Sequence, residues 1–196
     1  NTGRLGFLAD IPANEIETTI EHIFNGEYHI EERSNLQIEC PEYNDYPFAL
    51  NEIAVLKHDI SSMINVEVII NGETITTYWA DGLLVATSAG STAYSLSVGG
   101  PIVMPGSDVL IISPISPHNL NVRPLVVPSS SSISLRCRSR ADEVILSADN
   151  SSMTIPGDSR IDISLARFSL KRVRPSGSNF IGALVGKLHW GEDSRN

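Results

Sequence analysis

Residues 63–79 read MINVEVIINGETITTYW, and this stretch predicts a β-hairpin. Apolar and polar residues alternate on both sides of the pair Asn71-Gly72, as they do in half-buried strands. Asn-Gly between two such segments is a strong hairpin signal, because both central residues of a type I′ turn need positive φ. We therefore expect an antiparallel sheet with this hairpin in it.

The alternation of apolar and polar residues begins near residue 28 and continues on both sides of the hairpin. Further strands are expected at residues 46–56, 83–86, 109–112, 125–127, 133–137, 144–146, 161–165 and 168–173. Clusters of proline and serine separate several of them. Many short strands and no long βαβ helices favour a mainly β fold of stacked antiparallel sheets, similar to a β-sandwich.

Helices are expected only near the two ends of the chain. Residues 13–25 carry one apolar stripe and stop at Gly26, so they predict an N-terminal helix whose stripe packs in a core. The stripe consists of Ile16, Ile20, Ile23 and Phe24. Residues 180–188 predict a short closing helix, and residues 4–8 predict a buried strand segment. Because residue 1 is Asn, we expect the chain to be a piece of a longer protein.

Composition limits the classes of partner. The 196 residues carry a net charge of −9, which argues against nucleic-acid binding, since that requires a basic face. No apolar run approaches the roughly 20 residues of a membrane span, so no membrane partner is expected. Cys40 and Cys137 lack metal or redox spacing, which favours a reduced cytoplasmic location. No metal ligands are expected in this chain.

The most unusual stretch is residues 81–101, DGLLVATSAGSTAYSLSVGGP. A buried strand here runs into a loop of small and hydroxyl residues, then into a short helix. Such a junction can cradle a nucleoside or a phosphate, and Tyr94 offers a ring for stacking on a base. The alternative is a tight turn packed by small residues. Neither of the two common glycine-rich phosphate loops occurs in the sequence.

Two polar pairs interrupt apolar strand patterns. Asn51-Glu52 follows an apolar segment, and its donor and acceptor groups suit the vicinal hydroxyls of a ribose. The alternative is a pair at a strand edge or turn without a ligand. Asp149-Asn150 interrupts the end of the strand expected at residues 144–146.

At these residues the sequence resembles the NAD kinases, which phosphorylate NAD to NADP. The matching segments are residues 5–8, 49–52, 81–82 through 92–97 with 99–102, 116–118 with 123–125, and 187–190. They follow the order of the family and span nearly the whole chain. The Gly-Ser-Thr-Ala-Tyr-Ser block at residues 90–95 is the specific one.

The resemblance implies a C-terminal β-sandwich domain that holds the dinucleotide. It assigns residues 1–26 to the end of a linker with one helix, 27–175 to the dinucleotide-binding domain and 176–196 to a tail with a short helix. The family's Gly-Gly-Asp-Gly motif, with the aspartate taken as the catalytic base, is absent from this sequence. It is expected in an upstream α/β domain, so no catalytic residue is expected in this chain and little turnover by it alone.

Residue by residue, the resemblance implies the following contacts. Asn51 and Glu52 would bind the adenosine ribose, Thr92 and Ala93 the adenine, Tyr94 the adenosine, and Ser97 polar groups of the ligand. Asp81 would reach the nicotinamide amide in a neighbouring subunit, with Ser116 and His118 near the same end. Ala89 replaces a threonine usual in the family, and Asn150 departs from the pattern expected there, although both positions stay candidate ligand contacts.

The resemblance also implies the partners. The substrates would be NAD and ATP, the latter with a divalent cation such as Mg²⁺, and the protein would be a dimer or tetramer with an intersubunit site. Two alternatives stay open, a related lipid-kinase domain and a noncatalytic β-sandwich that binds nucleotides.

Overall fold

The computed structural model describes residues 11, 13–175 and 180–188. The strand expected at residues 4–8, and the matching residues 189–190, lie outside this part of the chain. The elements are η1 (Ala13–Glu15), α1 (Ile16–Phe24), β1 (Tyr28–Glu39), β2 (Phe48–Ala49), β3 (Glu52–Lys57), β4 (Ile64–Ile70), β5 (Glu73–Ala80), β6 (Gly82–Thr87), η2 (Ala89–Thr92), α2 (Tyr94–Ser97), β7 (Val109–Ile115), β8 (Leu125–Pro128), β9 (Ile133–Arg138), β10 (Glu143–Ala148), β11 (Ser151–Pro156), β12 (Arg160–Pro175) and α3 (Phe180–Leu188).

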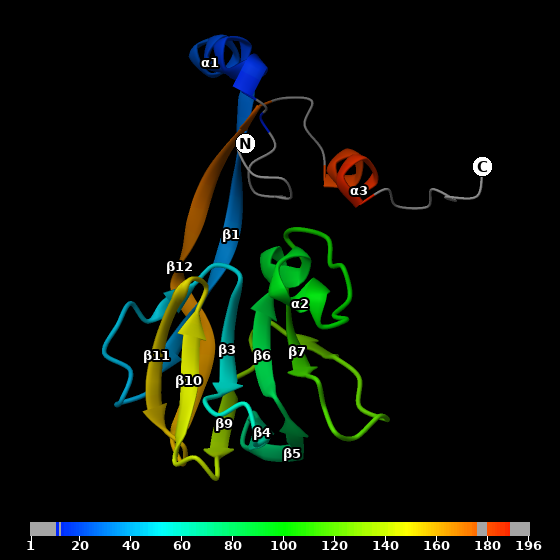
Figure 1. The fold of residues 1–196 in the computed structure, drawn as a ribbon. Coiled ribbons are helices and arrows are strands. Elements are labelled where there is room, and N and C mark those ends of the chain that lie inside the picture. Colours follow the sequence, from blue (N-terminus) through cyan, green and yellow to red (C-terminus); the bar gives the residue numbers. More distant parts are fainter. Residues whose placement is uncertain (1–10, 12, 176–179, 189–196) are drawn as a thin grey trace, which may run out of the picture. The chain divides into compact units, whose positions relative to one another are not determined.

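The strands form two six-stranded sheets (Figure 1). The first sheet has the order β2-β1-β12-β9-β4-β5, and the second has the order β11-β10-β3-β6-β7-β8. Every strand pair whose register is recorded is antiparallel. The mainly β fold of stacked antiparallel sheets is therefore confirmed.

The hairpin predicted at residues 63–79 is present as β4 and β5. Ile70 pairs with Glu73 across a two-residue turn, and Asn71 and Gly72 have φ values of 52° and 87°. The side chain of Asn71 also accepts a hydrogen bond of 3.0 Å from the N–H of Ser132. This contact ties the turn to the residue just before β9.

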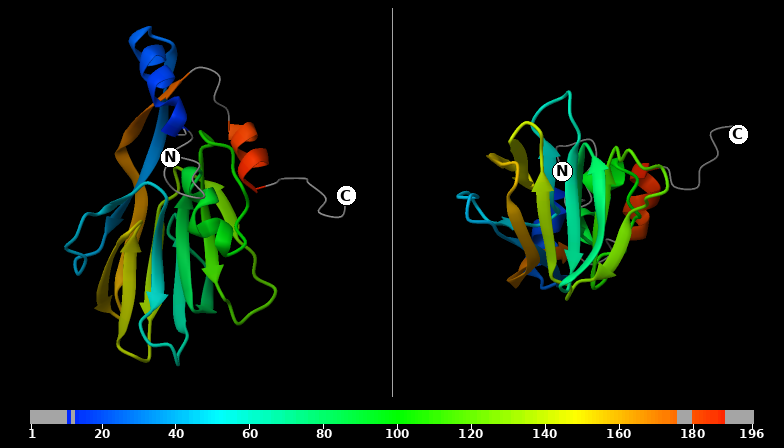
Figure 2. Two further views of the ribbon diagram at one scale, coloured as in Figure 1. Left: turned by 45° about the horizontal axis from the view of Figure 1, so that its top comes forward. Right: turned by 90° about the horizontal axis from the view of Figure 1, so that it is seen from below.

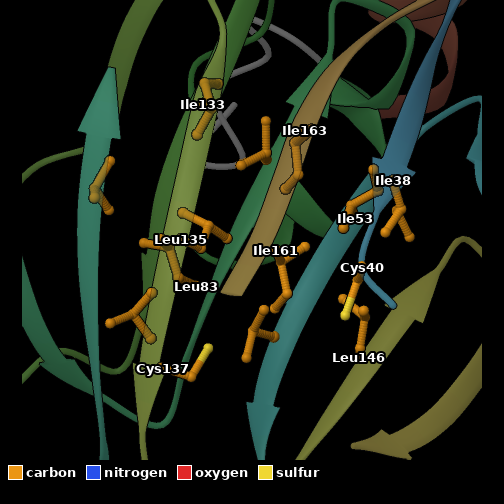
Figure 3. Packing of buried hydrophobic residues seen from close by; sticks show 14 of the residues in the cluster. Ile38, Cys40, Ile53, Leu83, Ile133, Leu135, Cys137, Leu146, Ile161 and Ile163 are labelled. Atoms are coloured by element: carbon orange, nitrogen blue, oxygen red, sulfur yellow. The ribbon is translucent and has the colours of Figure 1, made fainter. Parts of the chain in front are cut away.

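The main core lies between the two sheets, whose inner faces meet (Figure 2). Each sheet contributes alternate residues of its strands, as antiparallel sheets packed face to face do. Figure 3 shows ten of them with labels: Ile38, Cys40, Ile53, Leu83, Ile133, Leu135, Cys137, Leu146, Ile161 and Ile163.

The second sheet is buried on both faces around β6. All six residues of β6 are buried, which explains why its sequence is a continuous apolar run rather than an alternation. Leu83 and Val85 face the main core. Leu84 and Ala86 belong to a smaller apolar cluster on the other face, against which Val98 packs.

Two strand predictions need correction, and one strand was not predicted. Residues 46–56 do not form one strand, because the chain bends at Leu50-Asn51 between β2 and β3. The segments 161–165 and 168–173 are parts of one 16-residue strand, β12. Residues 151–156, where no strand was predicted, form β11, which pairs with β10 from Ala148↔Ser151 to Glu143↔Pro156.

The chain divides into two compact units, residues 1–32 with 171–196 and residues 33–170. The helix predicted at residues 13–25 is present as η1 and α1, and the closing helix as α3. The expectation that the α1 stripe packs in a core is wrong for this structure. Its four apolar side chains are 40–87% exposed, and α1 contains no buried residue.

The two cysteines are reduced and buried. Burial raises the pKa of Cys40 to about 11 and that of Cys137 to about 12. Thiolate is the reactive form, so we expect both thiols to resist a disulfide reagent at pH 8 in the folded protein and to react once urea unfolds it. Rapid modification of either thiol in the absence of urea would contradict this prediction.

Candidate functional site

The bend at residues 50–52 is held from the β6 side by Thr87, the last residue of β6. The hydroxyl of Thr87 donates a hydrogen bond of 2.7 Å to the carbonyl oxygen of Leu50. The backbone N–H of Thr87 donates one of 2.9 Å to the carbonyl oxygen of Asn51. The same hydroxyl accepts the N–H of Gly90 at 3.1 Å. Thr87 therefore joins the bend to the start of η2.

Gly90 lies directly against this bend. A Cβ atom at position 90 would stand 2.1 Å from the carbonyl oxygen of Asn51 and 2.6 Å from its carbonyl carbon. Only a residue without a side chain allows the two backbones to approach so closely. The sequence at residues 87–90 thus brings the hydroxyl-rich loop and the Asn51-Glu52 pair together.

Glu52 connects the bend to α2. Burial and, to a smaller extent, the nearby carboxylate of Asp149 raise the pKa of its carboxyl group to about 7, against the lowering effect of a hydrogen bond from the backbone N–H of Tyr94. Within the described part of the chain, Glu52 Oε2 is buried and has no hydrogen-bond partner. A buried acceptor in this state gains most from a ligand that brings a hydroxyl donor. Tyr94 is 37% exposed, so it remains accessible to a ligand.

The loop itself does not offer a row of open amides. The N–H groups of Gly90, Ser91 and Ala93 donate to Thr87 Oγ1, to the carbonyl of Ser88 and to the carbonyl of Gly90, respectively. The α2 helix has only four residues. Of the two ligands considered for this loop, the geometry favours the nucleoside over the phosphate.

The candidate residues fall into two groups at opposite ends of β6. One end gathers the bend, the η2–α2 loop and the β10–β11 turn, and it carries Asn51, Glu52, Ala89, Thr92, Ala93, Tyr94, Ser97 and Asn150. The other end carries Asp81, Ser116 and His118, because Gly82 pairs with Ile115. At about 3.3 Å per residue, β6 separates the two groups by roughly 17 Å.

At its own end of β6, Asp81 forms an ion pair of 2.7 Å with Lys57. Beside it, the rings of Trp79 and His118 stack with centroids 4.6 Å apart, and Ser116 has a left-handed backbone with φ of 46°. Trp79 is 49% exposed and was not among the candidates. Its only signal in the sequence is a large aromatic residue at the end of a strand.

A hollow of about 570 Å³ lies on the first sheet. Arg136, Arg138 and Arg160 line it. Arg136 pairs with Glu67 at 3.2 Å and Arg160 with Asp162 at 3.1 Å. These carboxylates offset much of the positive charge, so the hollow is a weaker candidate for a ligand than the Glu52 region.

The described residues contain no group of three or more His, Cys, Asp or Glu side chains placed to hold a metal ion. No helix in the same residues is both long and apolar enough to cross a membrane.

A family profile described as the ATP-NAD kinase C-terminal domain matches residues 50–175, which contain both groups of candidate residues. The fold and this match define the class of protein, since the chain comprises the β-rich C-terminal domain of a kinase.

Comparison with similar protein sequences identifies the family within this class of kinases. An NAD kinase from Bacteroides fragilis is 49% identical over 197 residues, covering all of this chain and 68% of that protein. An NAD kinase from Cytophaga hutchinsonii is 43% identical over 198 residues with the same coverage. This chain belongs to the NAD kinase family, the kinases that phosphorylate NAD, and the resemblance seen in the sequence is confirmed.

Solved structures agree with this assignment. The yeast NADH kinase complexed with NADH has a TM-score of 0.88 at 28% identity, over 98% of this chain and 58% of that chain. An NAD kinase from Archaeoglobus fulgidus in complex with ATP has a TM-score of 0.81 at 30% identity, over 96% of this chain and 72% of that chain. The present chain therefore spans only part of the length of these proteins.

Proposed function

We propose that this chain binds the adenosine half of NAD at the Asn51, Glu52 and Tyr94 end of β6, within an enzyme that converts NAD to NADP with ATP. The observation that carries the proposal is the buried, unpaired oxygen of Glu52 beside an exposed tyrosine ring. Vicinal ribose hydroxyls supply the missing donors, and the ring stacks on the adenosine. Thr92, Ala93 and Ser97, on the same loop and helix, contact the adenine and other polar groups of the ligand.

The nicotinamide end of the ligand lies against Asp81, Ser116 and His118 of another copy of the chain. The roughly 17 Å between the two groups within one copy supports this arrangement, since a neighbouring copy can bring its far end to the site. The functional protein is then a dimer or tetramer. Sedimentation of a monomer at micromolar concentration with saturating NAD would rule the arrangement out.

The reaction is phosphoryl transfer. The adenosine 2′-hydroxyl oxygen forms a bond to the γ-phosphorus of ATP, the bond from that phosphorus to the β–γ bridging oxygen breaks, and the hydroxyl proton passes to a base outside this chain. This chain contributes positioning, because its contacts fix the ribose that carries the attacking oxygen. A divalent cation, expected to be Mg²⁺, accompanies ATP, and a cytoplasmic location fits the two reduced cysteines.

Replacement of Tyr94 tests the proposal. NAD should raise the melting temperature of the wild-type chain by mass action. We expect Tyr94→Ala to bind NAD roughly 10- to 100-fold more weakly, because base stacking on an aromatic ring contributes about 1–3 kcal/mol. Tyr94→Phe should keep most of the response, since the ring remains. A wild-type chain whose melting temperature is unaffected by NAD or NADP would favour a noncatalytic module or a lipid-kinase relative.

A further inference from the structure

The β10–β11 turn meets the bend at residues 50–52 through one carboxylate. Asp149 Oδ2 accepts the N–H of Leu50 at 2.7 Å, and Oδ1 accepts the N–H groups of Asn51 and Glu52 at 2.8 and 3.0 Å. The backbone N–H of Asp149 donates to the carbonyl oxygen of Glu52 at 3.0 Å. Four hydrogen bonds therefore join one residue to three consecutive residues of the site.

The backbone of Asp149 is adapted to this contact. Its φ is 49°, in the left-handed region that aspartate and asparagine tolerate better than other residues with a side chain. Ala148 still pairs with Ile53 in the β10–β3 ladder, so Asp149 is the first residue beyond the sheet at this end. The left-handed turn places its carboxylate within reach of all three amides.

Three successive backbone N–H groups directed at one point form a concavity that binds anions. Here the concavity of residues 50–52 is occupied by an anion of the chain itself. Hydrogen bonds to an ionised acceptor are among the strongest in proteins, so the bend is held from one side by Asp149 and from the other by Thr87. The bend has little freedom left when a ligand arrives.

We infer that Asp149 is a positioning residue for NAD binding, whose carboxylate fixes the orientation of Asn51 and Glu52 without touching the ligand. The inference rests on the proposed function. Asp149 acts through the backbone of the bend, and its negative charge also acts on Glu52, whose pKa it raises. Removing the charge should therefore change both how tightly NAD binds and the pH at which binding is half lost.

Asp142 provides a matched control. It is also an aspartate with a left-handed backbone, φ of 57°, it lies in the preceding turn between β9 and β10, and it is exposed. Alanine at either position strains the backbone equally. Any excess effect at position 149 therefore reports the contact with the bend.

We expect Asp149→Ala to weaken NAD binding at least 30-fold relative to Asp142→Ala, measured by calorimetry on the chain. In Asp149→Asn, one side-chain carbonyl oxygen remains to accept two of the three backbone N–H groups. We therefore expect this variant to bind NAD about 3- to 10-fold more weakly than the wild type. In Asp149→Asn the pH midpoint of NAD affinity should also fall, because the charge beside Glu52 is gone, whereas a loss of general stability would leave it unchanged. Equal affinity in Asp149→Ala and Asp142→Ala would overturn the inference.

Hydrogen exchange separates the inference from the proposed function. The amides of residues 50–52 should exchange faster in Asp149→Ala than in Asp142→Ala, with or without NAD. Unchanged exchange would overturn the inference even if the wild-type chain binds NAD. A wild-type chain that does not bind NAD, with faster exchange in Asp149→Ala, would overturn the proposed function and with it the role of Asp149 in binding.

Discussion

Gly90→Ala should abolish most of the NAD binding of this chain and destabilise it. The added Cβ would stand 2.1 Å from the carbonyl oxygen of Asn51, where an ordinary contact is above 3 Å. The obstacle is backbone on both sides, so no side-chain rotation relieves the overlap. The bend or the loop must move by about 1 Å or more, and overpacking of this kind typically costs about 1–3 kcal/mol of folding stability.

The effect on binding should exceed the effect on stability, because the movement falls on the residues that hold the ribose. The carbonyl displaced by the methyl group belongs to Asn51, and the next residue is Glu52. Displacements near 1 Å in a positioned site reduce its function roughly 100-fold. We expect a loss of that order in NAD affinity, measured by calorimetry at a temperature where circular dichroism shows the variant folded.

Gly186→Ala is the control for replacing a glycine in this chain. Gly186 lies in α3, and a Cβ atom there would meet nothing within 4 Å among the described residues. Alanine favours a helix over glycine by about 1 kcal/mol, so this variant should be at least as stable as the wild type. Unimpaired NAD binding in Gly90→Ala would show that the close approach of loop and bend has no bearing on the site.

The sequence correctly predicted those parts of the fold that depend on the backbone conformation or burial of neighbouring residues. The Asn71-Gly72 hairpin depends on two positive φ values, and the run at residues 83–86 depends on burial of both faces of β6. The bend at Leu50-Asn51 could not be found in this way. The carboxylate of Asp149, almost a hundred residues away in sequence, accepts hydrogen bonds from the backbone N–H groups of Leu50 and Asn51. The sequence of residues 46–56 gives no indication of that contact.

The candidate site also combines features that neighbouring residues reveal with contacts between residues far apart in the sequence. The polar pair and the hydroxyl-rich loop were recognised from residue types, and the structure brings them together through Gly90 and Thr87. The contribution of Asp149 was missed because an aspartate in a two-residue turn is common for reasons of backbone conformation alone. The apolar stripe of residues 13–25 correctly predicted a helix, but the expected packing of that stripe in a core was wrong, because the sequence of a helix does not decide what lies against its apolar face.

The affinity for NAD should depend on pH through Glu52. Burial and the carboxylate of Asp149 raise the pKa of Glu52 to about 7, from the 4.5 of a glutamate free in water. The ionised carboxylate accepts both ribose hydroxyls, so affinity follows the ionised fraction, rising roughly tenfold per pH unit up to pH 7 and levelling off above it. Between pH 5 and pH 8 we expect a change of about 50- to 100-fold in the dissociation constant, measured by calorimetry.

Glu52→Gln tests whether the pH dependence of NAD binding comes from this carboxyl group. The amide does not ionise, so the variant should bind NAD weakly and lose most of the pH dependence between pH 5 and pH 8. A wild-type dissociation constant that stays constant over this range would contradict the assignment of Glu52 to the ribose.

The stability of the ligand-free protein should respond to Glu52 in the opposite direction. A carboxyl group whose pKa is raised by folding favours the folded state fully below its unfolded pKa of about 4.5. That contribution is lost as the pH rises to about 7, because ionisation then disfavours the folded state. Glu52→Gln should therefore gain stability relative to the wild type in urea unfolding at pH 8, and less so at pH 5. Weaker binding together with a gain in stability identifies a residue retained for its ligand, since a purely structural carboxylate would lose stability when replaced.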